Sequence, residues 1–372
     1  PLGAFLSGGI DSSVVTGLAA KQTDRLKTFS IGFKDEPMFD ETEFALSVSK
    51  KHNTEHTVFN ISNDDLFNIV FEVLDYLDEP FGDSSALNVY LLSRETKKKV
   101  TVALSGDGAD ELFGGYNKHM AEWRIRNRGW IESLLITSQP LWQWLPQSRH
   151  SKLGNTIRQF NRFTEGAKMN PADRYWSWAS FGTEKEAMNM LKDKVIDDEY
   201  FSRKKENVKF INGASDLNDV FRNDMSLVLV NDMLVKVDLM SMANSLEVRS
   251  PFVDYKVAEF AFKIPSDFKI NKTGRKKIIK DTFSDLLPAE VLQRNKQGFE
   301  VPLLKWFRNE LRSLIKDDLL ADNFIVRQGI FNPESVKRLK HLIFDSSSPG
   351  EAVHRIWGLI VFQYWWKKNM EL

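Results

Sequence analysis

The chain has 372 residues, of which 27% are charged and 42% hydrophobic, proportions that exclude a collagen-like, mucin-like or mostly disordered chain. Its 51 basic and 51 acidic residues balance, so no net positive charge favours a nucleic-acid partner, and we expect none. The absence of cysteine excludes disulfides, thiolate metal sites and a cysteine nucleophile within this sequence. The length allows one large α/β unit or two to three domains.

No stretch of the sequence reaches the ~18–20 apolar residues that a membrane-spanning helix needs. The most apolar segment, residues 356–366, is shorter and is interrupted by Gln363, so we interpret it as a buried C-terminal helix rather than a helix on a membrane surface. No signal-peptide pattern is recognisable, and Pro1 opens directly on an apolar run, which suggests that upstream residues have been removed. We expect a cytoplasmic protein without a membrane partner.

Strand-like and helix-like segments alternate over residues 1–120. The expected strands are residues 2–6, 27–33, 56–61 and 100–104, and the expected helices are residues 11–20, 41–51, 64–77 and 86–98. This alternation predicts an α/β fold with a parallel sheet that binds its ligand outside the carboxyl ends of the strands. Residues 121–372 have mainly helical patterns, with a short loop at 346–350 before the last helix.

The first motif, SGGIDSS at residues 7–13, lies between an expected strand and an expected helix. Its glycines allow a tight turn close to a ligand, and the exposed amides at a helix start favour an anion. Asp11 would repel a bare phosphate, so it suits a site in which a divalent cation separates the carboxylate from phosphates. The segment is neither a Walker A loop nor a GxGxxG fingerprint, and its simplest alternative is a plain turn into a helix.

The second motif, LSGDGADELFGGY at residues 104–116, also follows an expected strand. Asp107, Asp110 and Glu111 stand beside a turn that Gly106 and Gly108 make possible. Alone, this could be an ordinary surface loop. A second carboxylate at another strand end is, however, what Mg²⁺ shared between two loops requires.

These motifs resemble those of a known family. SGGIDSS is similar to the pyrophosphate loop of the ATP pyrophosphatases, and LSGDGADELFGGY with SLEVRSPFVD at residues 245–254 resembles the synthetase domain of glutamine-hydrolysing asparagine synthetases. The resemblance extends over essentially the whole chain, 1–372. It implies an adenine nucleotide alpha hydrolase-like (PP-loop) core in residues 1–120, a mainly helical part in residues 121–372, and an N-terminal glutaminase domain that is absent from this chain.

The resemblance also implies cofactors and the residues that hold them. Asp11 and Asp110 match positions that bind Mg²⁺. The positions that match ATP-binding residues are Leu6, Ser7, Gly8, Gly9, Asp11, Ser12, Ile31, Ser105 and Gly106.

Two catalytic positions are implied as well. Asp107 stands where the family commonly has a longer glutamate implicated in forming the acyl-adenylate, and Ala109 stands where a serine is common. Lys276 matches a lysine that contacts phosphate oxygens and offsets their developing charge, although Lys280 replaces the usual arginine. Without the resemblance, the basic run at residues 275–277 would be interpreted as a solvated helix start.

For the acceptor, the resemblance implies Glu247 and Arg249 as substrate-binding residues at the floor of the site. The alternative is a structural ion pair between these two side chains. Residues 78–80 and 83–84 resemble another family loop near the active site. Asp232, Lys236 and Asp238 have spacings that favour structural pairing along a helix.

Residues 52–56, HNTEH, match the H-x-x-E-H string of zinc proteases. That chemistry needs both histidines on one helix, whereas Asn53-Thr54 favours a break and His56 opens a strand-like run. We therefore expect no zinc site here.

The resemblance implies an ATP-dependent amide ligase that converts aspartate into β-aspartyl-AMP with release of pyrophosphate. Ammonia then gives asparagine and AMP. The expected partners are aspartate, ammonia and an upstream glutaminase domain or subunit, and a homodimer is left open. Lacking cysteine, this polypeptide is not expected to hydrolyse glutamine. Two alternatives stay open: a related synthetase with another acceptor, like β-lactam synthetases or peptide cyclases, and a non-catalytic nucleotide-binding subunit.

Overall fold

The structure is a computed structural model that describes residues 1–35, 40–142, 145, 152–192, 198–293, 301–346 and 352–370. Its internal contacts divide the chain into two compact units. The first unit comprises Pro1–Asp78, Asp83–Met120 and Asp224–Val301. The second comprises Glu79–Gly82, Ala121–Asn223 and Pro302–Leu372.

The first unit is built on a five-stranded parallel sheet of order β3-β2-β1-β4-β5. Its strands are β1 (Leu2–Phe5), β2 (Lys27–Phe33), β3 (Glu55–Ile61), β4 (Val102–Leu104) and β5 (Glu247–Arg249). The expected parallel α/β core is therefore confirmed. From β1 the chain steps outward to β2 and β3 and then returns to β4 on the other side of β1. Open α/β sheets bind ligands at such a switch point, beyond the carboxyl ends of the strands.

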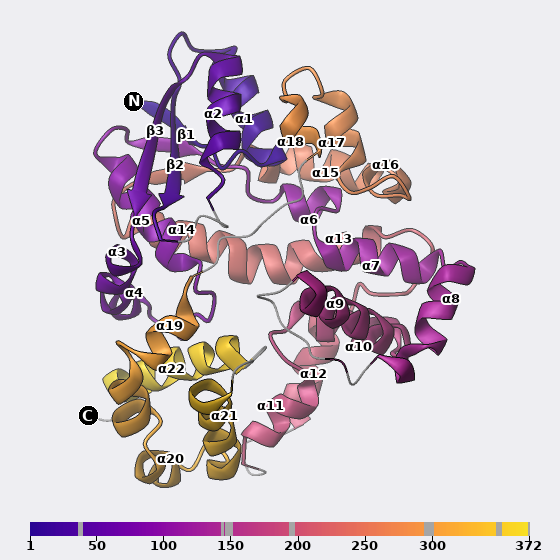
Figure 1. Ribbon diagram of the computed structural model, residues 1–372. Coiled ribbons are helices and arrows are strands. Elements are labelled where there is room, and N and C mark those ends of the chain that lie inside the picture. The colour runs from indigo at the N-terminus through magenta and orange to yellow at the C-terminus, as the bar shows by residue number, and fades with distance from the viewer. Residues whose placement is uncertain are drawn as a thin grey trace. The chain divides into compact units, whose positions relative to one another are not determined.

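Helices cover both faces of this sheet. α1 (Ile10–Ala20) and α2 (Thr42–His52) contact β1, β2 and β3 (Figure 1), whereas α5 (Ala86–Lys97) and α14 (Leu234–Met242) pack on each other and contact β2 and β5. Right-handed crossovers explain the two layers, because the chain changes direction across the sheet after β3. The other elements of this unit are α3 (Asn63–Asn68), α4 (Val70–Tyr76), α6 (Ala109–Phe113), the π-helix η4 (Met225–Met233), the 3₁₀ turn η5 (Pro251–Val253), α15 (Tyr255–Lys263), α16 (Ser266–Lys269), α17 (Lys277–Thr282) and α18 (Ala289–Gln293).

An apolar core joins the helices that begin next to the two motif loops. Val15 of α1, Leu112 of α6 and Ile279 of α17 belong to one cluster of buried side chains. Each buried aliphatic side chain of this size stabilises the fold by about 1.5–3 kcal/mol relative to exposure. The cluster therefore fixes the starts of these three helices relative to one another.

Residues 224–301 lie in the sheet-containing unit, although we expected the chain after residue 120 to be a mainly helical part. The reason is β5, which pairs in parallel with β4 so that Val102 lies opposite Glu247 and Leu104 opposite Arg249. Three residues are too few to show the alternation that identifies a strand in a sequence. The helix expected at 64–77 forms as α3 and α4, separated at Ile69. Apart from Ser346, the loop expected at 346–350 lies outside the described residues.

The second unit is helical. The C-terminal apolar segment forms the middle of its last helix, where Ile356, Ile360 and Gln363 are buried, so the expected buried helix is confirmed. In the part of the chain that the structure describes, no helix has the length and apolar character needed to cross a membrane. The elements are α8 (Trp130–Thr137), the 3₁₀ turn η2 (Gln139–Leu141), α9 (Lys152–Ala167), α10 (Pro171–Ala179), α11 (Glu184–Met190), α12 (Asp198–Asn207), α19 (Leu303–Arg308), the π-helix η6 (Leu314–Leu319), α20 (Asp322–Gln328), α21 (Pro333–Asp345) and α22 (Ala352–Asn369), and α7 (Asn117–Arg126) and α13 (Asn218–Asp224) each have residues in both units.

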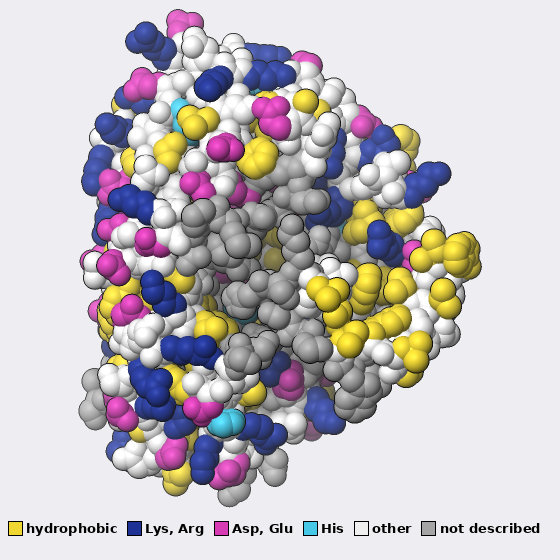
Figure 2. All heavy atoms as spheres, in the orientation of Figure 1, with side chains coloured by type: hydrophobic (Ala, Val, Ile, Leu, Met, Phe, Trp, Pro, Cys, Tyr) yellow, Lys and Arg dark blue, Asp and Glu magenta, His cyan; other side chains and the backbone are white. Residues whose placement is uncertain are grey.

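One surface of the second unit is apolar. Trp130 and Leu134 of α8 are 76% and 60% exposed, and Leu141, which follows, is 82% exposed. Figure 2 shows a group of hydrophobic side chains on the right of the view, where Figure 1 draws α8. Apolar patches of this kind are typical of surfaces that contact another molecule.

A buried ionic network holds α7, α10 and α13 together within the second unit. The carboxylate of Glu122 accepts hydrogen bonds from Nε of Arg126 (2.8 Å) and from Nε of Arg174 (2.6 Å), and these side chains are 5% exposed. Arg126 also donates to both carboxylate oxygens of Asp219 (2.9 and 3.0 Å). Burial opposes ionisation of Glu122, but the two arginines outweigh it and lower the pKa of Glu122.

We predict that Glu122→Gln lowers the free energy of unfolding by about 3–5 kcal/mol, because it leaves buried arginine charge without its partner. Glu199→Gln is a matched control, since Glu199 also pairs with an arginine four residues later but both side chains are more than half exposed. That change is expected to cost less than about 1 kcal/mol. Urea unfolding followed by tryptophan fluorescence measures both values. The contribution of Glu122 is complete above the unfolded-state pKa and is lost as the pH falls through its lowered folded-state pKa. Equal losses in the two variants would contradict the network's role.

Candidate active site

The two motif loops meet because they leave adjacent strands. β1 and β4 pair directly, with Ala4 opposite Leu104, so residues 6–9 and 105–108 begin side by side. The approach is close: a Cβ on Gly106 would lie 2.8 Å from the backbone N of Ser12 and 2.9 Å from Cβ of Asp11. Only glycine fits at position 106, because any side chain would push the second loop away from the start of α1.

The first loop presents amides and hydroxyls at the start of a helix. Gly8 has φ +70°, and a Cβ there would lie 2.5 Å from Cβ of Phe44. The hydroxyls of Ser7 and Ser12 lie 3.1 Å apart, and the amide of Gly9 donates to Oγ of Ser7 (3.3 Å). Gly9 is the N-cap of α1 and caps it without a side chain. Such a turn, with a helix dipole behind it, is suited to bind an anion such as a phosphate.

Lys276 lies between the carboxylates of Asp11 and Asp110. Its Nζ is 2.5 Å from Oδ2 of Asp11 and 2.5 Å from Oδ1 of Asp110. The three side chains are only 6%, 16% and 12% exposed, in the order lysine, Asp11 and Asp110. Three segments far apart in the sequence thus bring one cation and two carboxylates to one point.

The backbone around Lys276 supports this contact at a cost. Lys276 has φ +53°, a left-handed conformation that a lysine adopts only with strain of roughly 1–2 kcal/mol. A Cβ on Gly115 would lie 1.6 Å from Oδ1 of Asp110 and 2.2 Å from Cε of Lys276, so the site requires glycine there. Nη1 of Arg275 donates to the carbonyl oxygen of Gly115 (2.9 Å) and holds that segment in place. Strain of this kind is typical of functional sites.

The carboxylates fit a magnesium ion by their chemistry. Mg²⁺ prefers oxygen ligands and is usually bound through one or two carboxylates together with phosphates and water. That one ammonium group contacts both carboxylates shows that oxygens of Asp11 and Asp110 already converge on a single cation. Among the described residues, no group of three or more His, Cys, Asp or Glu side chains forms a metal site by itself.

The second loop is fixed to β5. The amide of Ser105 donates to the carbonyl oxygen of Arg249 (2.8 Å), and Oγ of Ser105 lies 2.6 Å from Oγ of Ser250. Gly108 has φ +89°, and a Cβ there would lie 2.3 Å from Cγ1 of Val253. Asp107 lies in this turn and is partly buried. The loop therefore depends on a strand that comes from the later part of the chain.

Behind the second loop, Glu111 is buried and only 1% exposed. Burial raises the pKa of Glu111 to about 7, although the hydroxyl of Tyr116, which donates to its carboxylate at 2.5 Å, opposes the rise. The backbone N–H of Tyr116 donates to Nδ1 of His119 (3.3 Å), and Nε2 of His119 then donates to Asp224 (2.6 Å). Burial alone would raise the pKa of Asp224, but Lys118 and His119 lower it to about 2.

The other predicted site residues lie in two places. Leu6 directly follows β1 and Ile31 lies within β2, and the two side chains are 1% and 5% exposed. Glu247 and Arg249 lie on β5 with side chains 48% and 72% exposed, and Nε of Arg249 donates to Glu247 at 2.5 Å. Their internal ion pair matches the structural alternative, and a role of these side chains in substrate binding stays a prediction.

The sequence did not indicate a second charged cluster. Nζ of Lys236 lies 2.7 Å from Oδ2 of Asp83 and donates to Oγ of Ser85 (3.0 Å), although these residues are about 150 positions apart in the chain. The only signal was the weaker family loop at residues 83–84. The helical spacing instead favoured pairing of Lys236 along its own helix.

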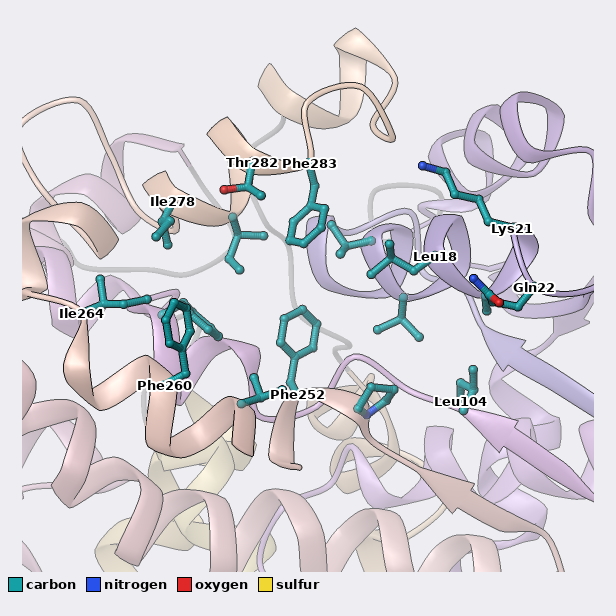
Figure 3. Close-up of a pocket in the computed structure, with 17 residues that line it drawn as sticks. Leu18, Lys21, Gln22, Leu104, Phe252, Phe260, Ile264, Ile278, Thr282 and Phe283 are labelled. Atoms are coloured by element: carbon teal, nitrogen blue, oxygen red, sulfur yellow. The ribbon is translucent and has the colours of Figure 1, made fainter. Parts of the chain in front are cut away.

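An apolar cavity of about 550 Å³ lies in the same unit (Figure 3). Apolar residues of the motifs, among them Leu104 and Phe113, line it, but Asp11, Asp110 and Lys276 do not. Leu18 of α1, Phe252 of η5 and Phe283 line it, with Lys21 and Gln22 at one end. The cavity shares α1 and α17 with the site and lacks its carboxylates. The paired loops are therefore the stronger candidate for chemistry.

The histidines of the zinc-protease string lie on different elements, as expected. His52 ends α2, and its Nε2 contacts the carbonyl oxygen of Leu286 (2.8 Å). His56 lies on β3 and bonds Thr28 (2.9 Å) and Ser30 (3.1 Å).

Comparisons with known proteins agree with the motifs. A family model described as asparagine synthase matches residues 1–367. Asparagine synthetase (glutamine-hydrolyzing) 1 of Bacillus subtilis strain 168 is 30% identical over 378 residues, covering 100% of this chain and 56% of that protein. A Mycobacterium tuberculosis H37Rv protein provisionally named asparagine synthetase (glutamine-hydrolyzing) is 28% identical over 372 residues, covering 98% and 54%. The Bos taurus asparagine synthetase (glutamine-hydrolyzing) is 22% identical over 372 residues, covering 94% and 50%. The chain spans about half the length of these curated relatives.

We predict that Lys276→Met lowers the free energy of unfolding of the ligand-free protein by about 3 kcal/mol, because two mostly buried carboxylates lose their shared cation. Lys277→Met is the control, since Lys277 pairs with Asp281 at a surface where the side chains are 36% and 60% exposed. It is expected to cost less than about 1 kcal/mol. Urea unfolding at neutral pH measures both values. Unchanged stability of Lys276→Met would show that the contact contributes nothing.

Proposed function

The chain belongs to the asparagine synthase family, and from this membership and the site geometry we propose that it is an ATP-dependent amide ligase acting on aspartate. ATP would activate the side-chain carboxylate as β-aspartyl-AMP with release of pyrophosphate. Ammonia would then convert this intermediate into asparagine and AMP. The observation that carries the proposal is the meeting of Asp11, Asp110 and Lys276 at the junction of the two loops.

The loops divide the binding of ATP between them. The amides and hydroxyls of residues 7–12 are suited to the pyrophosphate part, because they line a helix start with donors. Ser105 and Gly106, with the apolar side chains of Leu6 and Ile31, would hold the nucleoside part. Asp11 and Asp110 would hold Mg²⁺, which when bound neutralises phosphate charge.

In the first step, an oxygen of the aspartate side chain forms a bond to the α-phosphorus, and the bond from this phosphorus to the pyrophosphate oxygen breaks. The protein's contribution would be positioning and charge stabilisation. Lys276 is well placed for this because its ammonium is mostly buried and already lies at the junction. Once phosphates occupy the site, it would exchange carboxylate oxygens for phosphate oxygens. Asp107, in the adjoining turn, would act in forming the acyl-adenylate.

In the second step, the nitrogen of ammonia forms a bond to the acyl carbon. The bond from this carbon to the AMP oxygen breaks, and a proton leaves the nitrogen. The names of the relatives state that they hydrolyse glutamine. We propose that a glutaminase domain or subunit supplies the ammonia to this chain and that free ammonium replaces it in vitro.

The direct test measures pyrophosphate release by the chain with ATP, Mg²⁺, L-aspartate and ammonium. We expect release to depend on aspartate and the nucleotide product to be AMP. ADP as product would contradict the scheme. Release with another carboxylic acid but not with aspartate would instead indicate a related synthetase with a different acceptor. ATP binding without turnover of any acid would indicate a non-catalytic subunit.

Asp11→Asn and Asp110→Asn are each predicted to lower pyrophosphate release at least about 100-fold, because each removes one charge that positions the cation and phosphates. Asp24→Asn is the matched control, since Asp24 is exposed and lies just before β2, at the amino ends of the strands. It should leave the rate unchanged. Full activity of either Asp11→Asn or Asp110→Asn would remove the basis of the proposal.

The role of Asp107 can be tested by separating charge from reach. Asp107→Asn is expected to lower the rate of adenylate formation by about 100-fold, whereas Asp107→Glu keeps the charge and should stay within about fivefold of the unaltered protein. Aspartate-dependent ATP–pyrophosphate exchange measures this step without ammonia. Equal exchange rates for Asp107→Asn and the unaltered protein would assign Asp107 a structural role only.

A further inference from the structure

We propose that Asp232, supported by Asp83 and Lys236, binds the α-ammonium group of the amino-acid acceptor. This inference rests on the proposed function and adds the residues that recognise the amino acid. The side chains come from the segment before α5 and from the helix formed by η4 and α14.

The helix that carries Asp232 has an unusual shape. Residues 225–233 form a π-helix, and regular α-helix resumes at Leu234. π-Helical turns are rare and occur frequently at functional sites, because they change the direction in which side chains leave the helix. Asp224 at its start pairs with Lys118 and His119, and Asp232 near its end lies beside Asp83. The π-helix thus runs between two buried charged groups.

The cluster has more carboxylate than ammonium. Lys236 is 8% exposed, and its Nζ is occupied by Asp83 (2.7 Å) and Ser85 (3.0 Å). Oδ1 of Asp232 is buried and has no hydrogen-bond partner among the described residues. A buried carboxylate oxygen without a donor is costly, and a ligand that brings a positive charge with N–H donors offsets that cost.

The electrostatics agree with a cationic ligand. Burial and the charge of Asp83 raise the pKa of Asp232 to about 6, against the opposing effect of Lys236 and Lys118. The charged groups that act on Asp232 are therefore Asp83, Lys236 and Lys118, and the ammonium of Lys118 is already paired with Asp224. Asp232 is partly buried beside Asp83, and a cation that contacts both carboxylates would offset the repulsion between them.

An alkylammonium group fits better than a metal ion. Lys236 already places one positive charge in the cluster and would repel a divalent cation, and in the part of the chain described here no three metal-ligating side chains gather. An ammonium carries a single charge and three donors, which match the oxygens of Asp232 and Asp83.

The cluster also lies within electrostatic reach of the reaction site. Burial opposes protonation of Lys236, but Asp83, Asp232 and also Asp107 raise its pKa. Asp107 belongs to the second motif loop, next to Gly106. An amino acid held by its α-ammonium at Asp232 would thus have its other end available to the loops that bind ATP.

The test compares Asp232→Asn with the Asp24→Asn control in the chain that carries the proposed activity. Aspartate-dependent ATP–pyrophosphate exchange should show a KM for L-aspartate raised at least about tenfold in Asp232→Asn, the loss of one charge-assisted hydrogen bond. The KM for ATP should stay within about twofold. Ser85→Ala, which removes a hydroxyl that accepts from Lys236 and donates to Asp83 but leaves Asp232 in place, should raise the KM for aspartate by a smaller factor. Circular dichroism and thermal unfolding establish that each variant is folded.

Calorimetric titration with L-aspartate and succinate provides a second readout, since succinate keeps both carboxylates and lacks the ammonium group. The unaltered chain should bind aspartate at least about tenfold more tightly than succinate, and Asp232→Asn should bind the two equally. The inference would be overturned if Asp232→Asn kept the unaltered chain's preference for aspartate over succinate. It would also be overturned if this change raised the KM for ammonium rather than the KM for aspartate. Either result would leave the proposed function intact. Absence of aspartate-dependent pyrophosphate release from the unaltered chain would overturn the proposed function itself.

Discussion

The contact of Lys276 with Asp11 and Asp110 is the interaction around which the first unit is arranged. An ammonium group 2.5 Å from each of two carboxylates keeps them close in a place where solvent hardly screens their repulsion. Two features of the backbone make this contact possible. Lys276 has a left-handed backbone conformation, and position 115 is a glycine because no side chain would fit there. As a result, two mostly buried carboxylates share a single positive charge.

The order of the strands determines that this contact forms where it does. β1 and β4 are neighbours although the chain visits β2 and β3 between them. Both motif loops therefore leave the same edge of the sheet next to each other, and no space for a side chain is left between Gly106 and the start of α1. The buried residues of α1, α6 and α17 then hold the three charged side chains in register. Positioning of this kind is most of what a phosphoryl or adenylyl transfer requires of a protein.

The two charged clusters of the first unit share one feature. In each, a lysine that is less than a tenth exposed lies against a carboxylate, and a second carboxylate stands beside them. Buried charge that is not fully balanced lowers stability in the free protein. Such an imbalance is offset when a ligand of opposite charge binds, which is how a binding site differs from the closed Glu122 network of the second unit.

The residue pattern by itself determined the alternation of strands and helices up to β4, because runs of apolar strand and helix residues are local signals, although the helix expected at 64–77 forms as two helices. It also determined that both glycine-containing loops follow strands, and the family resemblance supplied their residues with roles, among them Lys276. Only the tertiary structure decided that Glu247–Arg249 forms a strand and that residues 224–301 return to the sheet. The pairing of Lys236 with Asp83 could not be predicted from the sequence either, because the two residues are about 150 positions apart. The local spacing instead favoured pairing of Lys236 with an aspartate on its own helix. Contacts between distant segments depend on how the chain packs, and neither short strands nor single charged residues carry a periodic signal that reports this packing in advance.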